Sequence, residues 1–186
     1  NKFAGTFGVG GCISFYPAKI IGCFGDGGIV LCNDDEVADK IRLLRDHGRD
    51  NAGNISLWGF NSRLDNLQAA FLDFFFKKYD DVISRRRNIA RLYYKYLEDI
   101  QEILLPPHPD QDESRRDVFQ NFEIEADQRD ELYDYLKKNK IGTLLQWGGK
   151  AVHEFRELGF NHNLPKTERI MRRSILLPLN LSINEE

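Results

Sequence analysis

Glycine is concentrated in the N-terminal part of the chain, and this constrains the local fold more than any other sequence feature. The segment GCFGDGG, residues 22–28, can adopt positive φ angles at little steric cost and so can turn the chain sharply. The flanking runs Gly11–Tyr16 and Ile29–Cys32 are apolar and short, as strands are. We therefore predict two strands joined as a hairpin or as a close pair.

Lys19 lies in an unusual position between these two expected strands. It follows Ser14 in the sequence SFYPAK, and apolar residues come directly after it. An amine withdrawn from water favours its neutral form, which can attack an aldehyde and form a Schiff base. Periodicity alone favours the other arrangement, in which the ammonium of Lys19 extends from a loop into water.

Ser14 and the nearby glycines add a second chemical requirement. The hydroxyl of Ser14 can hydrogen-bond an anion, and Gly10 and Gly11 let a ligand approach the backbone closely. A cofactor with an aldehyde and a phosphate would use the lysine for one group and the hydroxyl for the other. Pyridoxal 5'-phosphate is such a cofactor, and the protein around it supplies mainly binding and electronic tuning.

Helical patterns follow the expected strand pair. Asp34 can cap a helix that ends by Gly48, and an apolar helix begins near Leu64. Its segment AAFLDFFF is so apolar that we expect it either to be buried on most sides or to face a partner subunit. A charged helix follows over residues 82–97. Because composition changes from apolar to basic near residues 79–84, we predict domains at 1–80 and 81–186.

The second half of the chain reads as a smaller set of elements after a proline-rich, acidic connector at residues 105–117. We expect a strand in VFQNFEIEA (118–126), a helix at 127–140, a strand in TLLQW (143–147) and a short apolar segment, ILLPLN (175–180). Alternation of strands and helices predicts a small α/β domain.

The composition is that of a globular protein with an adequate core, with 41% hydrophobic, 12% aromatic and 30% charged residues in a chain of 186. The formal net charge of −3 gives no argument for a nucleic acid partner. No apolar run approaches the ~20 residues of a membrane span, and no signal peptide is visible. We therefore expect a cytoplasmic protein that binds neither nucleic acid nor membranes.

Cys12, Cys23 and Cys32 are odd in number, and their spacing does not resemble a zinc site or a redox pair. All three lie among apolar residues of the expected strand region, so we interpret them as reduced thiols of the core. His47 and His108 lie in expected loops, and their spacing indicates no metal site.

Three blocks of the sequence resemble one known family. GTFGVGGCISFYPAKIIGCFGDGGIV, residues 5–30, is similar to the cofactor-lysine segment of the DegT/DnrJ/EryC1/StrS sugar aminotransferases, and NDDEVADKIRLLRDHG and GFNSRLDNLQAA continue the match. The resemblance is good over residues 3–100 and loose beyond them. It implies fold type I of the pyridoxal-phosphate enzymes: the end of a large domain with a mixed sheet, followed by a small C-terminal α/β domain.

The resemblance also implies roles for individual residues. Lys19 corresponds to the catalytic Schiff-base lysine, and Ser14 corresponds to a ligand of the cofactor phosphate. Asn61 and Arg63 fall in a loop that, in this family, reaches across a homodimer to the neighbouring active site. Asn61 is the better candidate for the partner's phosphate, whereas Arg63 binds phosphate or substrate or pairs with Asp65 or another nearby acid. Without the resemblance, the segment NSR would be interpreted as a helix cap and a surface arginine.

The segment LQWGGKAVHEF departs from the family, in which many relatives have a His-Tyr-Pro element at this place. Two of its residues are candidates for substrate binding, Trp147 and His153. Trp147 can stack on a sugar or a base, or it can be a half-buried core residue. His153 can contact substrate, or it can be a packed or capping histidine.

The activity implied is transfer of an amino group from glutamate, or a similar donor, to a nucleotide-linked keto-deoxysugar for amino-sugar and polysaccharide biosynthesis. Lysine at position 19 favours transamination over the dehydration that a related, histidine-bearing branch performs. The alternatives are transamination of a cyclitol ketone and a catalytically silent or truncated relative that acts as a binding or regulatory subunit. We also expect the chain to be the C-terminal half of a longer enzyme, because the family's acid beside the pyridine nitrogen precedes this region.

Overall fold

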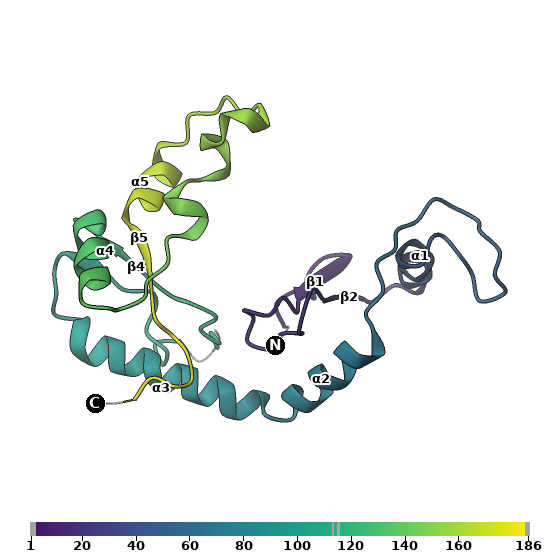
Figure 1. Cartoon of the computed structure of the whole chain (residues 1–186), viewed down its shortest axis with the longest axis horizontal. Coiled ribbons are helices and arrows are strands. Elements are labelled where there is room, and N and C mark those ends of the chain that lie inside the picture. The colour runs from purple at the N-terminus through teal and green to yellow at the C-terminus, as the bar shows by residue number, and fades with distance from the viewer. Residues whose placement is uncertain (1–2, 113, 115, 185–186) are drawn as a thin grey trace. The chain divides into compact units, whose positions relative to one another are not determined.

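The computed structural model describes residues 3–112, 114 and 116–184, and the chain forms two compact units that meet between Asp80 and Asp81 (Figure 1). Both units combine helices with small antiparallel sheets. Among the described residues, no helix combines the length and the hydrophobicity that crossing a membrane requires.

The first unit begins with the predicted strand pair. β1 (Gly10–Ser14) and β2 (Gly28–Cys32) are antiparallel, with Gly10 opposite Cys32 and Ser14 opposite Gly28. The hairpin prediction is therefore confirmed, although the connection between the strands is much longer than a tight turn. This long connection carries Lys19.

α1 (Asp35–Arg45) begins where the sequence predicts it. The side chain of Asp34 caps the helix, because its Oδ1 accepts a hydrogen bond from the backbone N–H of Val37 at 3.1 Å. Acidic residues in the first turn and basic residues in the last turn complement the helix dipole. α1 leads from β2 toward the segment that carries Asn61 and Arg63.

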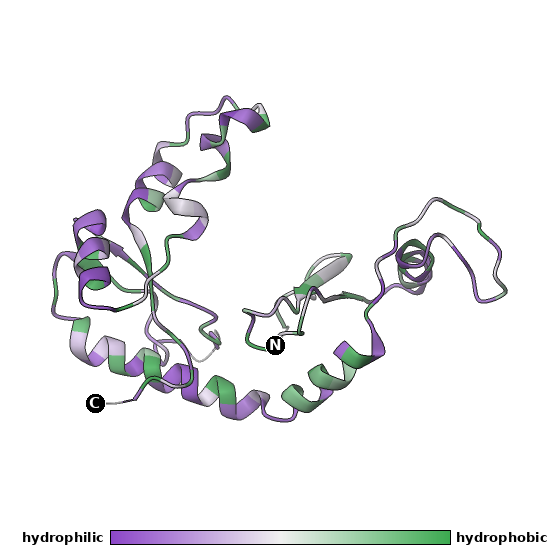
Figure 2. Cartoon of the chain, in the orientation of Figure 1, coloured by the Kyte–Doolittle hydropathy of each residue, from purple (hydrophilic) through white to green (hydrophobic). Residues whose placement is uncertain are grey.

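α2 (Asn66–Phe76) is apolar along most of its length, as Figure 2 shows. Leu72 is the buried residue of this helix, whereas Leu67, Phe74 and Phe76 are 68%, 54% and 66% exposed. Of the two alternatives for this segment, burial on most sides is therefore wrong within this chain. An apolar helix face this open requires a covering surface.

The second unit contains α3 (Tyr79–Leu97) and a sheet in the order β3-β4-β5, formed by β3 (Ile103–Leu104), β4 (Phe122–Ala126) and β5 (Ser174–Leu177). α4 (Arg129–Lys138) and α5 (Pro165–Arg173) complete the unit. Its core brings together one residue of α3 with the sheet and the segment before it: Ala90, Phe119, Phe122, Ile124 and Ile175.

The predicted strand TLLQW is wrong. Leu144 makes an isolated bridge to Leu176, and residues Gln146–Gly149 then form a 3₁₀ turn, η1. Trp147, Gly148 and Gly149 have φ angles of 50°, 68° and 76°, which are incompatible with a strand. Two further 3₁₀ turns follow, η2 (Val152–Glu154) and η3 (Arg156–Leu158).

The cysteine prediction is correct for one thiol and wrong as a statement about all three. All are free, but Cys23 is buried, Cys32 is half-buried and Cys12 is exposed. The reason is that the described residues do not cover both faces of this two-stranded sheet, so that Cys12, Ile13 and Ile29 remain exposed.

Candidate functional site

The connection between β1 and β2, residues 15–27, is here called the lysine loop. Backbone hydrogen bonds close its base and its interior: Phe15 N–H donates to Gly27 O at 2.8 Å, and Cys23 N–H donates to Phe15 O at 2.7 Å. The loop is therefore a folded extension of the strand pair, and Lys19 lies on it at a defined place.

Ser14 and Lys19 are brought together by this loop. Ser14, the last residue of β1, accepts a hydrogen bond from Tyr16 N–H at its Oγ (3.2 Å), and Lys19 N–H donates to Tyr16 O at 2.8 Å. Both residues are exposed. Among the described residues, the Lys19 ammonium has no hydrogen bond or ion pair, so the expected withdrawal of this amine from water is not met within this chain.

At two glycines of the lysine loop, Gly22 and Gly27, other atoms of the loop come so close that a side chain would collide with them. A Cβ on Gly22 would lie 2.7 Å from Tyr16 O, and a Cβ on Gly27 would lie 2.6 Å from the sulfur of Cys23. Contacts this short do not occur with real side chains, so glycine is needed at both positions. The density of glycine in this segment therefore reflects packing of the loop on itself.

Gln68 of α2 is a residue that our sequence analysis missed. Its side-chain Oε1 accepts a hydrogen bond from Phe24 N–H at 2.8 Å, and its Nε2 donates to Phe24 O at 3.1 Å. The Phe24 ring also lies edge-on to Phe71 of the same helix, with ring centroids 4.7 Å apart. The available signal was an amide, Gln68, within the otherwise apolar run LQAAF.

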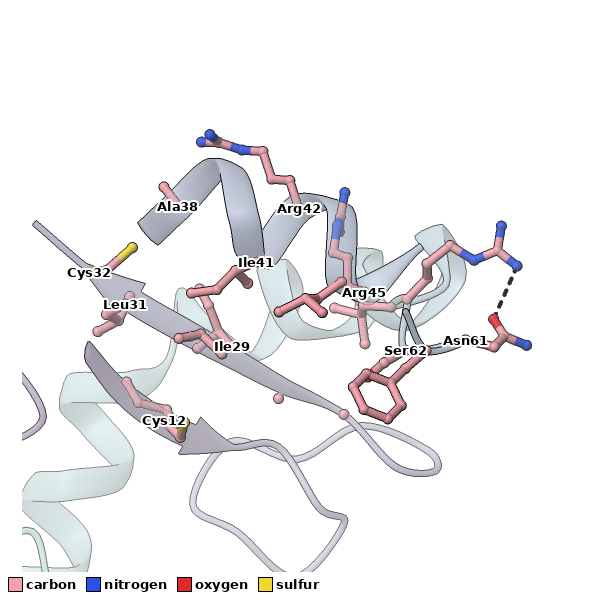
Figure 3. A pocket seen from close by; sticks show the side chains of 18 of the residues that line it. Cys12, Ile29, Leu31, Cys32, Ala38, Ile41, Arg42, Arg45, Asn61 and Ser62 are labelled. Atoms are coloured by element: carbon pink, nitrogen blue, oxygen red, sulfur yellow. Dashed lines mark hydrogen bonds between the residues drawn. The ribbon is translucent and has the colours of Figure 1, made fainter. Parts of the chain in front are cut away.

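Asn61 and Arg63 are brought together in the segment before α2. Arg63 donates to Asn61 Oδ1 at 3.2 Å (the dashed line in Figure 3) and forms an ion pair with Asp46 at 3.4 Å. The acid that pairs with Arg63 is thus Asp46 rather than Asp65. A hydrogen bond from Arg49 and the nearby arginine charges hold the pKa of Asp46 below its usual range. The Arg63 side chain remains 50% exposed.

An open cavity of about 1140 Å³ lies between the strand pair, α1 and residues 60–64 (Figure 3). Asn61 and Arg63 line it, whereas Ser14 and Lys19 do not. The chain therefore assembles two separate pairs of candidate residues. In the described part of the chain, no cluster of three or more His, Cys, Asp or Glu residues is suited to hold a metal ion.

The candidates in the second unit have opposite environments. Trp147 is 80% exposed, which excludes a half-buried core position within this chain. His153 is 7% exposed, and its Nε2 lies 3.2 Å from Glu168 Oε1. This interaction lowers the pKa of Glu168. Of the two alternatives for His153, substrate contact or a packed histidine, its environment matches the packed histidine.

Comparison with known proteins gives a consistent picture. The sequence matches the profile of the DegT/DnrJ/EryC1/StrS aminotransferase family over residues 1–186. It is 35% identical, over 100% of its length, to the pleiotropic regulatory protein of Geobacillus stearothermophilus, of which it covers 50%. It is 32% identical, over 98% of its length, to dTDP-3-amino-3,4,6-trideoxy-alpha-D-glucose transaminase of Micromonospora megalomicea subsp. nigra, again covering 50%. The chain thus spans about half the length of these curated relatives.

The structure agrees with the sequence comparison. The chain is similar to the crystal structure of a DegT DnrJ EryC1 StrS aminotransferase from Brucella abortus, with a TM-score of 0.88 and 33% identity. The match covers 100% of this chain and 49% of that one. This likeness confirms the predicted α/β fold of the pyridoxal-phosphate transferase class.

Proposed function

Because the chain belongs to the DegT/DnrJ/EryC1/StrS aminotransferase family, we propose that it carries the lysine-bearing half of a pyridoxal-phosphate aminotransferase. Its substrate in this proposal is a nucleotide-linked keto-deoxysugar, and its amino donor is glutamate or a similar amino acid. The observation that carries the proposal is that Lys19 is exposed on the folded lysine loop and Ser14 is exposed at the end of β1, where that loop begins.

The residues of the lysine loop fit the chemistry of pyridoxal 5'-phosphate. Lys19 offers an amine that is not engaged elsewhere among the described residues. The Oγ of Ser14 accepts from Tyr16 N–H, which leaves its hydroxyl proton available for a phosphate oxygen. When bound, the cofactor supplies an aldehyde for the lysine and a ring that withdraws electrons from the reacting carbon.

Lys19 has two tasks in this proposal. It would hold the cofactor at rest, and its amine, once released by the amino donor, would move a proton from the donor's α-carbon to C4′ of the cofactor. A flexible four-carbon side chain on a fixed backbone suits both tasks. The backbone bond from Lys19 to Tyr16 and the loop closure at Phe15 and Gly27 supply the fixed backbone.

Asn61 and Arg63 serve the neighbouring active site of a homodimer in this proposal. Within one chain, Asn61 and Arg63 line a cavity that Ser14 and Lys19 do not line, and this supports a role toward a second copy. Asn61 would donate its amide N–H groups to the partner's phosphate, since Arg63 already occupies its Oδ1. Arg63 would contribute positive charge for the phosphate or for the substrate.

The substrate proposal rests on the family and on Trp147. An exposed aromatic ring can stack on a sugar or a nucleobase, and Trp147 is 80% exposed. We infer that His153 contributes indirectly, since its bond to Glu168 ties the η2 turn to α5. The proposal places this activity in the cytoplasm.

Two alternatives remain as proposals of their own. A cyclitol ketone offers the same carbonyl chemistry without a nucleotide. A regulatory subunit without catalysis is favoured by one observation, namely the name of the Geobacillus relative. In the catalytic proposal, the remaining cofactor contacts come from residues outside this chain, as its half-length match to the relatives suggests.

The test uses the full-length protein that contains this chain. We expect a yellow protein, in which borohydride fixes the cofactor to Lys19 and mass spectrometry finds the modified peptide. Glutamate and a panel of nucleotide-ketosugars then identify the acceptor, with cyclitol ketones as the comparison. Replacement of Lys19 by Ala should abolish both half-reactions. A colourless wild-type protein that binds no cofactor would support the regulatory alternative.

A further inference from the structure

We propose that Gln68 is a positioning residue for Lys19, because it fixes the returning arm of the lysine loop, at Phe24, to α2. This inference rests on the proposed function for the role of Lys19, whereas the contact itself is a property of the chain. Lys19 lies within segment 15–23, which the Cys23–Phe15 bond closes, and Gln68 binds Phe24, the next residue after that closure.

One side chain satisfies both backbone groups of one residue. The Gln68 amide accepts from Phe24 N–H at 2.8 Å and donates to Phe24 O at 3.1 Å. These two bonds fix both the position and the orientation of the peptide groups around Phe24. A helix is a rigid base for such a contact, and Gln68 is half-buried in the first turn of α2.

The contact requires an amide specifically. A glutamine presents one acceptor and one donor side by side, at the length that reaches Phe24. A glutamate at position 68 keeps the acceptor for Phe24 N–H but has no donor for Phe24 O when ionised. An alanine leaves both groups of Phe24 without a protein partner.

Packing next to the amide holds the same point of the loop. The Phe24 ring centroid lies 4.7 Å from that of Phe71 and 6.2 Å from that of Phe75. Gln68, Phe71 and Phe75 share one face of α2, because they are spaced by three and four residues. Gly25 has a φ of 148° and would place a Cβ 3.5 Å from Gln68 Nε2, so the chain turns tightly around the amide.

The loop that carries Lys19 is therefore fixed by two sets of contacts. The Phe15–Gly27 and Cys23–Phe15 bonds fix the loop to the strands, and the Gln68 amide fixes it to the helix. Loss of the second anchor leaves the backbone bonds of Phe15 intact, but the closed segment 15–23 is then no longer fixed to α2 through Phe24. Because catalysis depends on placing the amine closely, a released loop reacts more slowly even when the protein stays folded.

The experiment compares Gln68→Ala and Gln68→Glu in the full-length protein, with Asp73→Ala as the matched control. Asp73 lies on the same helix, and its only described partner is Lys77, in an ion pair with side chains 71% and 69% exposed. Two quantities are measured: deuterium exchange of the amides of residues 20–27, and the rate constant at which Lys19 captures pyridoxal phosphate.

We expect Gln68→Ala to raise exchange in residues 20–27 and to slow capture by about ten-fold or more, as loss of two hydrogen bonds implies. Gln68→Glu should give a smaller change in the same direction, and it provides the test if Gln68→Ala does not fold. Asp73→Ala should match the wild type. A purely structural role would reduce the amount of Lys19 that reacts but leave its rate constant unchanged.

Three outcomes would overturn the proposal: an unchanged capture rate constant in both Gln68 variants, unchanged exchange in residues 20–27, or a uniform rise of exchange across β2 and α1. Failure of the proposed function is recognised separately. In that case, the wild type itself captures no cofactor at Lys19, and the exchange comparison alone decides whether Gln68 holds the loop.

Discussion

The two units of the chain differ in how many of their apolar side chains are buried. The second unit packs α3 and its sheet around Phe122 and Ile175, which are fully buried. The first unit buries Cys23 and Leu72 but leaves the apolar face of α2 and much of its strand pair exposed. The second unit thus carries its own core, whereas the first is held by backbone bonds, glycine contacts and the Gln68 amide. Stability and function are therefore expected to respond to different substitutions in the two units.

The largest effect should come from Phe122→Ala in the second unit. Its ring is fully buried and stacks on Tyr93, with centroids 4.6 Å apart, so truncation leaves a cavity. We expect the free energy of unfolding to fall by about 3–5 kcal/mol. Phe74→Ala on α2 is the matched comparison and should cost less than about 1 kcal/mol in this chain alone. Urea denaturation of both variants measures the difference, and equal losses would contradict the contrast between the units.

A smaller effect should follow from Gly27→Ala in the first unit. The new Cβ would meet the Cys23 sulfur at 2.6 Å and Leu64 at 3.2 Å, so the lysine loop must shift. We expect a loss of about 1–3 kcal/mol in the free energy of unfolding, as overpacking commonly gives. Adding Cys23→Ala to Gly27→Ala should recover part of the lost free energy of unfolding, because the contact with the Cys23 sulfur disappears. Strictly additive losses in the double variant would show that the sulfur is not the obstacle.

A pH effect is expected at Asp110 in the connector, which pairs with Arg91 of α3. Arg91 donates to Asp110 at 2.7 Å, and this bond lowers the pKa of Asp110 to about 2. A depressed carboxyl pKa adds stability above the unfolded value of 3.8, and this stability is lost as pH falls toward 2. Asp110→Asn should therefore be less stable than wild type at pH 6, and the difference should shrink by pH 2. A difference that stays constant with pH would assign the effect to packing.

The smallest effect on stability should come from Trp147→Ala, since the side chain is 80% exposed. We expect the free energy of unfolding to change by no more than about 0.5 kcal/mol. Under the proposed function, the KM for the nucleotide sugar should rise while the KM for the amino donor stays the same. An unchanged KM for the sugar would remove Trp147 from the proposed substrate site.

Local chemistry made part of this structure predictable from the sequence. The Asp34 cap acts within one turn, and the glycine-rich segment implies a change of direction, so α1 and the strand pair were found where they were expected. The placement of Ser14 and Lys19 on one connection also follows from their short separation along the chain.

Other features depend on parts of the chain that are distant in sequence. Gln68 and Phe24 are 44 residues apart, and no local pattern links them. The segment TLLQW has strand composition, but the left-handed backbone at Trp147 and the following glycines prevents pairing beyond Leu144. Cys12 has apolar neighbours and is nevertheless exposed, because burial in a sheet depends on what covers its faces.

Asp46 gives Arg63 a counter-ion before any ligand arrives. The carboxylate of Asp46 also accepts a hydrogen bond from Arg49, at 2.9 Å. Its negative charge therefore remains paired with a guanidinium even if Arg63 moves away. An incoming anion would therefore have to replace Asp46 as the ion-pair partner of Arg63, because the Arg63 guanidinium already has a counter-ion. Such an exchange favours a doubly charged group over a singly charged one, since only the former gains clearly over the carboxylate it replaces. Under the proposed function, Arg63 would thus favour ligands of higher negative charge.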